Sequence, residues 1–170
     1  MDQGRLHLYW GEGKGKTTAA TGLALRALGS GLRVTVVQFL KDGTSGELEP
    51  LRTLGAAIYA AMEFPKFVFQ MSEREKEQTW VQQTALLRQA LCKPCDLMIL
   101  DEACAAYQLG MVDRGLLKQV VLRRPAGCEA VLTGREPAPW MVQAADYITE
   151  MRCCRHPYET GLAARKGIEY

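Results

Sequence analysis

Apolar runs alternate along the chain with segments of helical spacing. The runs at 33–40, 96–100 and 129–133 (RVTVVQFL, DLMIL and EAVLT) are nearly continuous, which is typical of strands buried on both faces of a sheet. A shorter run, 5–10, predicts a first strand that leads into a glycine-rich turn. The pattern therefore predicts four strands separated by longer connections.

Helical signals fill those connections. Small and apolar residues fall at helical spacing over 16–28, and Gly29 supplies a stop. Ser72 with Glu75 forms a capping box that opens a helix to about Leu91, and Asp113 can cap a helix that stops before Arg124–Pro125. Strands alternating with helices predict an α/β fold with a mostly parallel sheet, helices on both faces and ligands at the carboxyl ends of the strands. No internal repeat or low-complexity linker interrupts residues 1–170, so we expect a single domain.

Charge and composition narrow the class of protein. The 170 residues carry 21 basic and 19 acidic side chains, a formal net charge of +2, with no basic run that would favour nucleic-acid binding. The amino-terminal segment lacks a secretory pattern, and no apolar stretch approaches the roughly 20 residues that cross a bilayer. We expect a cytoplasmic protein that binds neither nucleic acid nor membrane.

Six cysteines are then expected as thiols. Cys92 and Cys95 have the CxxC spacing, and Cys153 and Cys154 are adjacent, but a zinc site would need a second well-spaced pair or nearby histidines. The pattern favours small, half-buried side chains at the ends of helices and strands over a metal or redox function.

The turn after the first strand, GEGKGKTT, has the composition of a phosphate-binding loop. Glycines let several backbone N–H groups point at one anion, and the first turn of the following helix adds further donors. Lys14 and Lys16 supply positive charge, and the hydroxyl of Thr17 can ligate magnesium. The phosphate-binding residues are expected to be Gly11, Glu12, Gly13, Lys14, Gly15, Lys16, Thr17 and Thr18. The usual spacing places a small residue five positions before Gly15, where this chain has Trp10, so the loop is a modified one.

A pair of acids follows the apolar run that ends at Leu100. Asp101 and Glu102 at the end of a buried strand are costly unless a cation accompanies them, and magnesium bridging to phosphates explains both. With Thr17, they are the predicted metal-binding residues, and the sequence predicts MgATP binding.

Three uses of the nucleotide remain open from these residues alone: hydrolysis coupled to motion, phosphoryl transfer by a kinase, and transfer of another part of ATP. Glu102 after Asp101 could orient a water, which favours hydrolysis. A small-molecule kinase should carry an arginine-rich lid, and Arg123–Arg124 is the only internal arginine pair. The spacing of these residues does not decide among the three.

The chain resembles the P-loop type of ATP:corrinoid (cob(I)alamin) adenosyltransferase. The resemblance rests on GKGKTT, VQFLK, LMILDE, VLTGRE and the closing GIEY, in that order over nearly the whole chain. It implies a RecA-like fold, transfer of the 5′-deoxyadenosyl group of ATP to a cobalt(I) corrinoid, and release of intact triphosphate. It also implies Mg²⁺, an external reductant such as a flavin-type electron donor, and a homodimer.

The resemblance assigns further residues. Lys16, Glu102 and Arg135 are expected to be catalytic, and Arg135 lies just after a strand end, on the ligand side. Gln38 and Lys41 end another strand and are expected at the nucleotide site, because Gln38 within an apolar run needs a polar partner. The loop with Ser45 and Glu47 is expected to reach ribose or corrin. Phe67 and Phe69, alternating on one strand face, are the corrinoid candidates, with plain core packing as the alternative. His156 matches a family position, with a structural role equally open.

Two other functions stay open: a generic P-loop ATPase, and a module that binds ATP and corrinoid without alkyl transfer. Many family members use an amino-terminal extension to cover the active site, whereas the first strand here is expected at residue 5. We therefore expect the corrinoid pocket either to be more open or to be closed by another segment.

Overall fold

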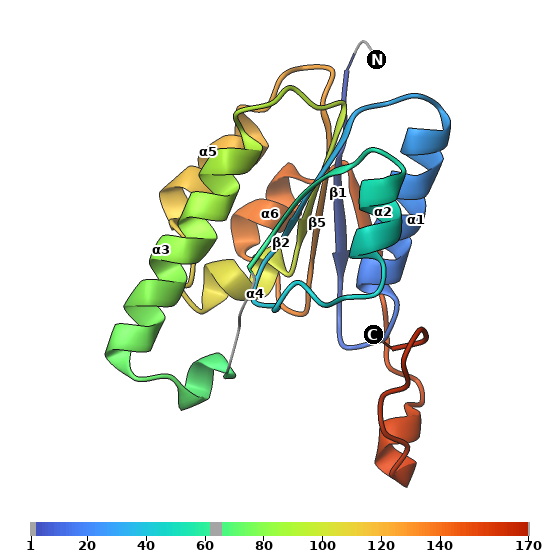
Figure 1. Cartoon of the computed structure of the whole chain (residues 1–170), viewed down its shortest axis with the longest axis vertical. Coiled ribbons are helices and arrows are strands. Elements are labelled where there is room, and N and C mark those ends of the chain that lie inside the picture. Colours follow the sequence, from blue (N-terminus) through green and yellow to red (C-terminus); the bar gives the residue numbers. More distant parts are fainter. Residues whose placement is uncertain (1–2, 62–65, 170) are drawn as a thin grey trace.

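A computed structural model describes residues 3–61 and 66–169 of the chain. Six strands form one sheet in the order β3-β2-β4-β5-β1-β6, and every neighbouring pair is parallel (Figure 1). The strands are β1 (Leu6–Trp10), β2 (Val34–Gln38), β3 (Ala57–Ala60), β4 (Leu97–Asp101), β5 (Glu129–Gly134) and β6 (Tyr147–Glu150). The predicted α/β fold with a parallel sheet is confirmed.

Helices cover both faces of this sheet, as the sequence predicts. They are α1 (Lys16–Gly29), α2 (Leu48–Thr53), α3 (Glu73–Ala90), α4 (Ala103–Gln108), α5 (Arg114–Leu122) and α6 (Pro139–Ala144), with 3₁₀ turns η1 (Val68–Gln70) and η2 (Pro157–Thr160). Figure 1 shows α1 and α2 on one side of the sheet and α3 to α6 on the other. Because every neighbouring pair of strands is parallel, the carboxyl ends of all six strands meet at one edge of the sheet.

The helix starts follow from their capping residues. Ser72 accepts a hydrogen bond from the N–H of Glu75 while the Glu75 carboxylate accepts one from the N–H of Ser72, which completes the predicted capping box of α3. Asp113 caps α5 by accepting from the N–H of Leu116. Gly15, the residue before α1, has φ 115°, a value that glycine adopts without the clash of a Cβ.

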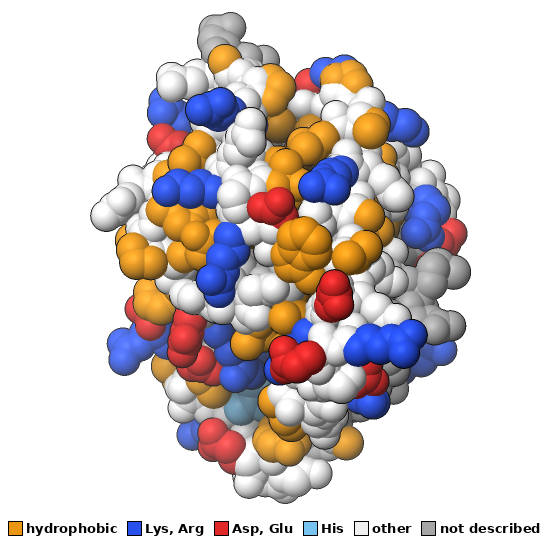
Figure 2. Space-filling model, turned by 90° about the vertical axis from the view of Figure 1, so that its left-hand side faces the viewer, with side chains coloured by type: hydrophobic (Ala, Val, Ile, Leu, Met, Phe, Trp, Pro, Cys, Tyr) orange, Lys and Arg blue, Asp and Glu red, His pale blue; other side chains and the backbone are white. Residues whose placement is uncertain are grey.

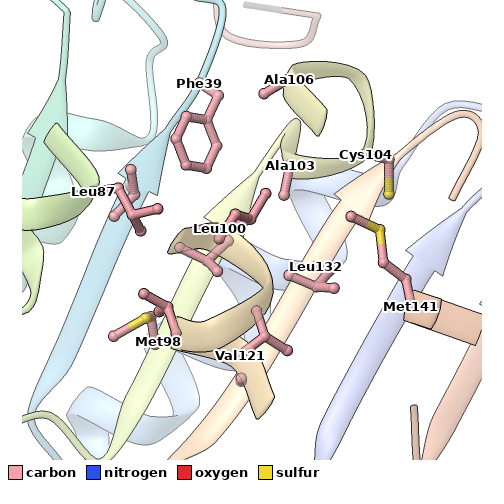
Figure 3. Close-up of a cluster of buried hydrophobic side chains, with 14 of the residues drawn as sticks. Phe39, Leu87, Met98, Leu100, Ala103, Cys104, Ala106, Val121, Leu132 and Met141 are labelled. Atoms are coloured by element: carbon pink, nitrogen blue, oxygen red, sulfur yellow. The ribbon is translucent and has the colours of Figure 1, made fainter. Parts of the chain in front are cut away.

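The larger core lies between the sheet and the layer of α3 to α6. Leu100 and Leu132 on the central strands point toward Leu87 of α3 and Met141 of α6, and all four are fully buried (Figure 3). Burying each such side chain contributes about 1.5–3 kcal/mol. The opposite face is covered by α1 through its small residues Ala20, Ala24 and Ala27, which let the helix approach the sheet closely. This approach fixes the start of α1 at the carboxyl end of β1.

Three local expectations differ from the structure. The strand expected over 33–40 ends at Gln38, because Leu40 turns the chain with φ 54°. The strands β3 and β6 were not predicted at all. Phe67 and Phe69 do not lie on a strand: Phe67 precedes η1, Phe69 lies within it, and their rings stack 5.6 Å apart. Because these rings are 69% and 82% exposed, the alternative of core packing is wrong as well.

The outer surface of the α3–α5 layer is mixed in character. Figure 2 shows basic and acidic side chains interspersed over this face, with apolar ones between them. Exposed apolar residues here include Trp80 and Val81 of α3 and Leu122 of α5. Within residues 3–61 and 66–169, no helix has both the length and the apolar character that spanning a bilayer requires.

Candidate functional site

The glycine-rich loop joins β1 to α1 and is braced by the chain that leaves β6. A Cβ added to Gly11 would lie 2.6 Å from the carbonyl oxygen of Met151, and one added to Gly13 would lie 2.7 Å from the same atom. The N–H of Gly13 donates to that oxygen at 2.6 Å. These glycines therefore serve a close backbone contact as well as the turn itself.

Lys16 closes the loop from inside. Its ammonium donates to the carbonyl oxygens of Gly11 and Gly13, each at 2.7 Å. The positive charge is thereby held at the centre of the loop, next to the start of α1, where unpaired N–H groups and the helix dipole also favour an anion. Loop, lysine and helix start lie together as the sequence predicts.

Asp101 is the most heavily hydrogen-bonded group of the site. Its Oδ1 accepts from the hydroxyls of Thr17 at 2.9 Å and Thr133 at 2.7 Å. Its Oδ2 accepts from Lys41 Nζ at 2.8 Å and Gln38 Nε2 at 3.3 Å. Burial opposes ionisation of this carboxyl, but the Lys41 charge and the hydrogen bonds outweigh it and hold its pKa below the ordinary value. Asp101 is therefore a buried, ionised carboxylate with four donors.

Lys41 is held in its charged form by the same contact. Its side chain is 28% exposed, and the burial that disfavours its charge is outweighed by Asp101, so the pKa of Lys41 is raised. The two groups form an ion pair at the carboxyl edge of the sheet, between the ends of β2 and β4.

Gln38 links Asp101 to the following loop. Its side chain is buried, its amide nitrogen donates to Asp101, and its amide oxygen accepts from the hydroxyl of Ser45 at 3.1 Å. The prediction that this buried amide has polar partners is confirmed.

Two non-glycine residues with left-handed backbone flank this cluster. Leu40, with φ 54°, precedes Lys41, and Glu102, with φ 58°, follows Asp101. Each such conformation costs about 1–2 kcal/mol. The N–H of Leu40 donates to Gln83 Oε1 at 3.3 Å, and that of Glu102 donates to the Thr133 hydroxyl at 2.9 Å. Backbone strain is thus stored where polar side chains converge, as is common at functional sites.

Thr133 is a site residue that the sequence did not reveal. Its fully buried hydroxyl bonds both Asp101 and the N–H of Glu102, and so orients the two adjacent acids at once. Burial, followed by the charge of Asp101, raises the pKa of Glu102. The one signal in the sequence was a threonine closing an apolar run, directly before Gly134 and Arg135.

Arg135 lies beside the loop, at the end of β5, as expected from its position. Its Nη1 pairs with Glu12 Oε2 at 3.1 Å, and both side chains are well exposed. Such a surface ion pair contributes little stability, so it does not prevent the guanidinium from exchanging its partner for a phosphate. The phosphate contact itself stays a prediction.

A cavity of about 410 Å³ opens beside the start of α1. One wall is α1, through Thr17, Thr18 and Thr21, and the second is the loop from Lys41 to Glu47. The third wall comes from the other end of the chain, Gly167–Glu169. Ser45 and Glu47 thus line this cavity, whereas the contribution of the carboxyl-terminal residues was not predicted.

The oxygen atoms at the site are ligand atoms that suit a hard cation. Thr17 donates its hydroxyl proton to Asp101, which leaves the lone pairs of Oγ1 free, and oxygen is the ligand atom that Mg²⁺ prefers. No cluster of three or more His, Cys, Asp or Glu side chains suited to a metal occurs in the part of the chain that the structure describes.

The remaining candidates lie apart from this cluster. Phe67 precedes the 3₁₀ turn η1 and Phe69 lies within it, and both side chains are exposed. Figure 1 shows this turn below the start of α3, at the end of the molecule toward which the strands run. His156 Nδ1 accepts from the N–H of Tyr158 and caps η2, a structural contact. Cys95 lies 3.7 Å, sulfur to sulfur, from Cys128, and all six cysteines are free thiols.

Comparison with known proteins identifies the family. The family model described as ATP:corrinoid adenosyltransferase BtuR/CobO/CobP matches residues 2–170. The chain belongs to this family. It is 33% identical to a corrinoid adenosyltransferase of Pseudomonas aeruginosa, with 99% of this chain and 85% of that protein covered. A corrinoid adenosyltransferase of Escherichia coli K12 is 30% identical, with 99% and 87% covered.

A solved structure supports the fold assignment. The KaiC-like protein PH0186 of Pyrococcus horikoshii aligns with a TM-score of 0.51 over 88% of this chain and 73% of that one, at 14% identity. At that identity the likeness concerns the fold alone. The RecA-like P-loop architecture expected from the sequence is confirmed.

Proposed function

We propose that this protein transfers the 5′-deoxyadenosyl group of ATP to the cobalt(I) of a corrinoid and releases inorganic triphosphate. The observation that carries the proposal is the phosphate loop with Lys16 at its centre, next to the Asp101–Thr17 hydrogen bond and to the 410 Å³ cavity that Thr17 lines. Membership of the corrinoid adenosyltransferase family supports the choice among the uses of ATP.

In the proposed reaction, the electron pair of cobalt(I) forms a bond to the 5′ carbon of ATP. The bond between that carbon and its oxygen breaks, and its electron pair leaves with the triphosphate, so that cobalt is formally oxidised to an alkylcobalt(III). Negative charge thus accumulates on the leaving oxygen. Lys16 and the N–H groups at the start of α1 are fixed donors that stabilise this charge without reorganising. We further propose Arg135 as a phosphate ligand recruited from its pair with Glu12.

Magnesium, when bound, would neutralise charge on the phosphate oxygens. Thr17 is the proposed direct ligand, because Asp101 accepts its proton and leaves its lone pairs available. Asp101 has all four of its acceptor positions engaged, so it acts by orienting Thr17. Glu102, whose backbone N–H donates to the Thr133 hydroxyl, is the proposed acid at the metal.

The stacked pair Phe67–Phe69 is the proposed corrinoid contact. Two exposed aromatic rings at the ligand edge provide an apolar platform that would exclude water from one face of a macrocycle. We also propose that an external reductant, such as a flavin-type donor, supplies cobalt(I), that the enzyme works as a homodimer, and that it is cytoplasmic.

The direct test mixes the protein with MgATP and chemically reduced cobalamin. We expect an alkylcobalt absorption spectrum and one triphosphate per cobalt alkylated. Steady release of orthophosphate regardless of corrinoid would identify a generic ATPase instead. Binding of both ligands with consumption of neither would identify a sensor or delivery module.

Replacing Phe67 and Phe69 together with alanine should lower the rate with corrinoid by roughly 10-fold, because about two stacked aromatic contacts are lost. ATP binding, measured by calorimetry, should stay unchanged, since neither residue lines the ATP cavity. The double replacement of the exposed Val81 and Leu122 is the matched control and should leave both quantities unchanged. Equal losses of ATP affinity and corrinoid turnover in the phenylalanine variant would contradict this division of roles.

A further inference from the structure

The last residues of the chain form a tied turn beside the phosphate loop. The Glu169 carboxylate accepts from Arg165 Nε at 3.2 Å, from its Nη2 at 3.1 Å and from its backbone N–H at 2.8 Å. The N–H groups of Ile168 and Glu169 donate back to the carbonyl oxygen of Arg165, at 3.2 and 2.9 Å. Gly167, with φ 78°, allows the reversal. The turn Arg165–Glu169 therefore holds its shape through its own contacts.

One contact ties this turn to the phosphate loop. Lys14 Nζ donates to the carbonyl oxygen of Ile168 at 3.2 Å, across 154 positions of sequence. From residue 152 onward nearly every residue is exposed, so packing against the body of the protein does not explain where the turn lies. The contact with Lys14 places Ile168 at the mouth of the 410 Å³ cavity, where its side chain is 58% exposed.

The cavity walls suit the uncharged half of a nucleotide. Glu47 and Glu169 both line it, and their carboxylates can accept hydrogen bonds from sugar hydroxyls or an amino group. Lys41 lines it too, but its charge is paired with Asp101 at 2.8 Å. Ile168 adds apolar surface, and the threonines of α1 add hydroxyls and methyl groups. The volume falls within the range of about 300–1,000 Å³ that is typical of small-molecule sites. Phosphate, by contrast, is drawn to Lys16 and the start of α1.

We propose that the turn Arg165–Glu169 is a wall of the nucleoside half of the ATP site, with Ile168 packed against the base or sugar. The inference rests on the proposed function and adds to it the residues that hold adenosine. It assigns the carboxyl-terminal turn to ATP binding and leaves the triphosphate to the loop.

Calorimetric titration of the whole protein with two ligands tests this assignment. One ligand is MgATP, and the other is tripolyphosphate with Mg²⁺, which lacks the nucleoside. Ile168→Ala should weaken MgATP binding by about 10-fold, because the side chain loses its apolar contact. Binding of tripolyphosphate should change by less than about 2-fold, since the loop and Lys16 are intact.

Two further variants sharpen the test. Leu162→Ala, in the same exposed segment but away from the cavity, is the matched control and should leave both affinities unchanged. Arg165→Ala removes the guanidinium that holds the Glu169 carboxylate in place, so it tests whether the position of Glu169 matters for ATP binding. It should raise the KM for ATP by roughly 5-fold or more while kcat stays within about 2-fold, as expected for lost uniform binding.

The outcomes separate this inference from the proposed function. If Ile168→Ala weakens the binding of ATP and of tripolyphosphate equally, or leaves ATP binding unchanged, the proposed nucleoside wall is wrong. If Ile168→Ala weakens ATP binding as expected but the wild-type protein forms no alkylcobalt, the nucleoside wall is supported and the proposed adenosyl transfer is wrong. Wild-type protein that binds tripolyphosphate but not ATP overturns both.

Discussion

Replacing Lys16 with alanine should reduce kcat/KM for adenosyl transfer by at least about 100-fold. The ammonium lies at the centre of the loop, 2.7 Å from two carbonyl oxygens, and is a full positive charge held where the triphosphate is proposed to bind. Loss of a single preorganised donor to a developing oxyanion costs about 10²–10³ in rate in comparable sites. The measurement is the initial rate of alkylcobalt formation at saturating corrinoid.

The matched control is Lys93→Ala. Lys93 is an exposed lysine between α3 and β4, at the opposite edge of the sheet, and its loss should leave the rate unchanged. Lys16→Ala should also weaken MgATP and tripolyphosphate together, unlike Ile168→Ala, because both ligands use the loop. A variant that keeps more than about a third of the wild-type rate would contradict the role given to Lys16.

The central strands and the loop were predictable because their signals are local. The continuous apolar runs that became β2, β4 and β5 are dictated by burial on both faces, and the capping residues Ser72 and Asp113 determine their helix starts within four positions. The juxtaposition of Thr17 and Asp101 also follows from sequence, because parallel strands bring their carboxyl ends to one edge.

The edge strands escaped prediction for a physical reason. All four residues of β6 are exposed, so burial imposes no apolar pattern on them, and only pairing with β1 makes them a strand. The four residues of β3, AIYA, are apolar but only half-buried, and two of the four are alanine, which is a weak strand former. Phe67 and Phe69 illustrate the opposite error, because alternation suggested a strand where the chain forms a 3₁₀ turn that exposes both rings.

The missing parts of the site depend on tertiary contacts. Thr133 meets Asp101 across 32 positions, and Ile168 meets Lys14 across 154, through a backbone carbonyl that carries no sequence signal. The brace of Gly13 against Met151 is likewise a backbone contact. The charged groups of the site could therefore be predicted from the sequence. The groups that orient them and enclose the cavity could be identified only from the structure.

Replacing Asp101 with asparagine should impair both stability and activity. The change leaves the ammonium of Lys41 without its counter-charge in a largely buried position, which should lower the free energy of unfolding by about 3 kcal/mol. It also removes an anionic acceptor that orients Thr17, so kcat/KM should fall by about 10–100-fold, with a raised Mg²⁺ requirement. Urea unfolding and the Mg²⁺ dependence of the rate measure the two effects.

The stabilisation that the Asp101 carboxylate provides should depend on pH. The pKa of Asp101 lies below its ordinary value, so its stabilisation is fully present above the unfolded pKa of about 3.9 and is lost as pH falls through the folded pKa. The free energy of unfolding of the wild type should therefore decline faster below about pH 4 than that of Asp101→Asn. Parallel declines in the two proteins would contradict the ionised, hydrogen-bonded carboxylate.

Two further variants separate charge pairing from catalysis. Asp96→Asn lies at the other end of the same strand, where Asp96 pairs with Arg33 on the surface, and it should leave the rate unchanged. Adding Lys41→Met to Asp101→Asn removes the orphaned charge and should restore part of the lost stability, with no recovery of adenosyl transfer. In the double variant, two uncharged side chains replace the ion pair. A full recovery of its activity would show that Asp101 serves the fold alone.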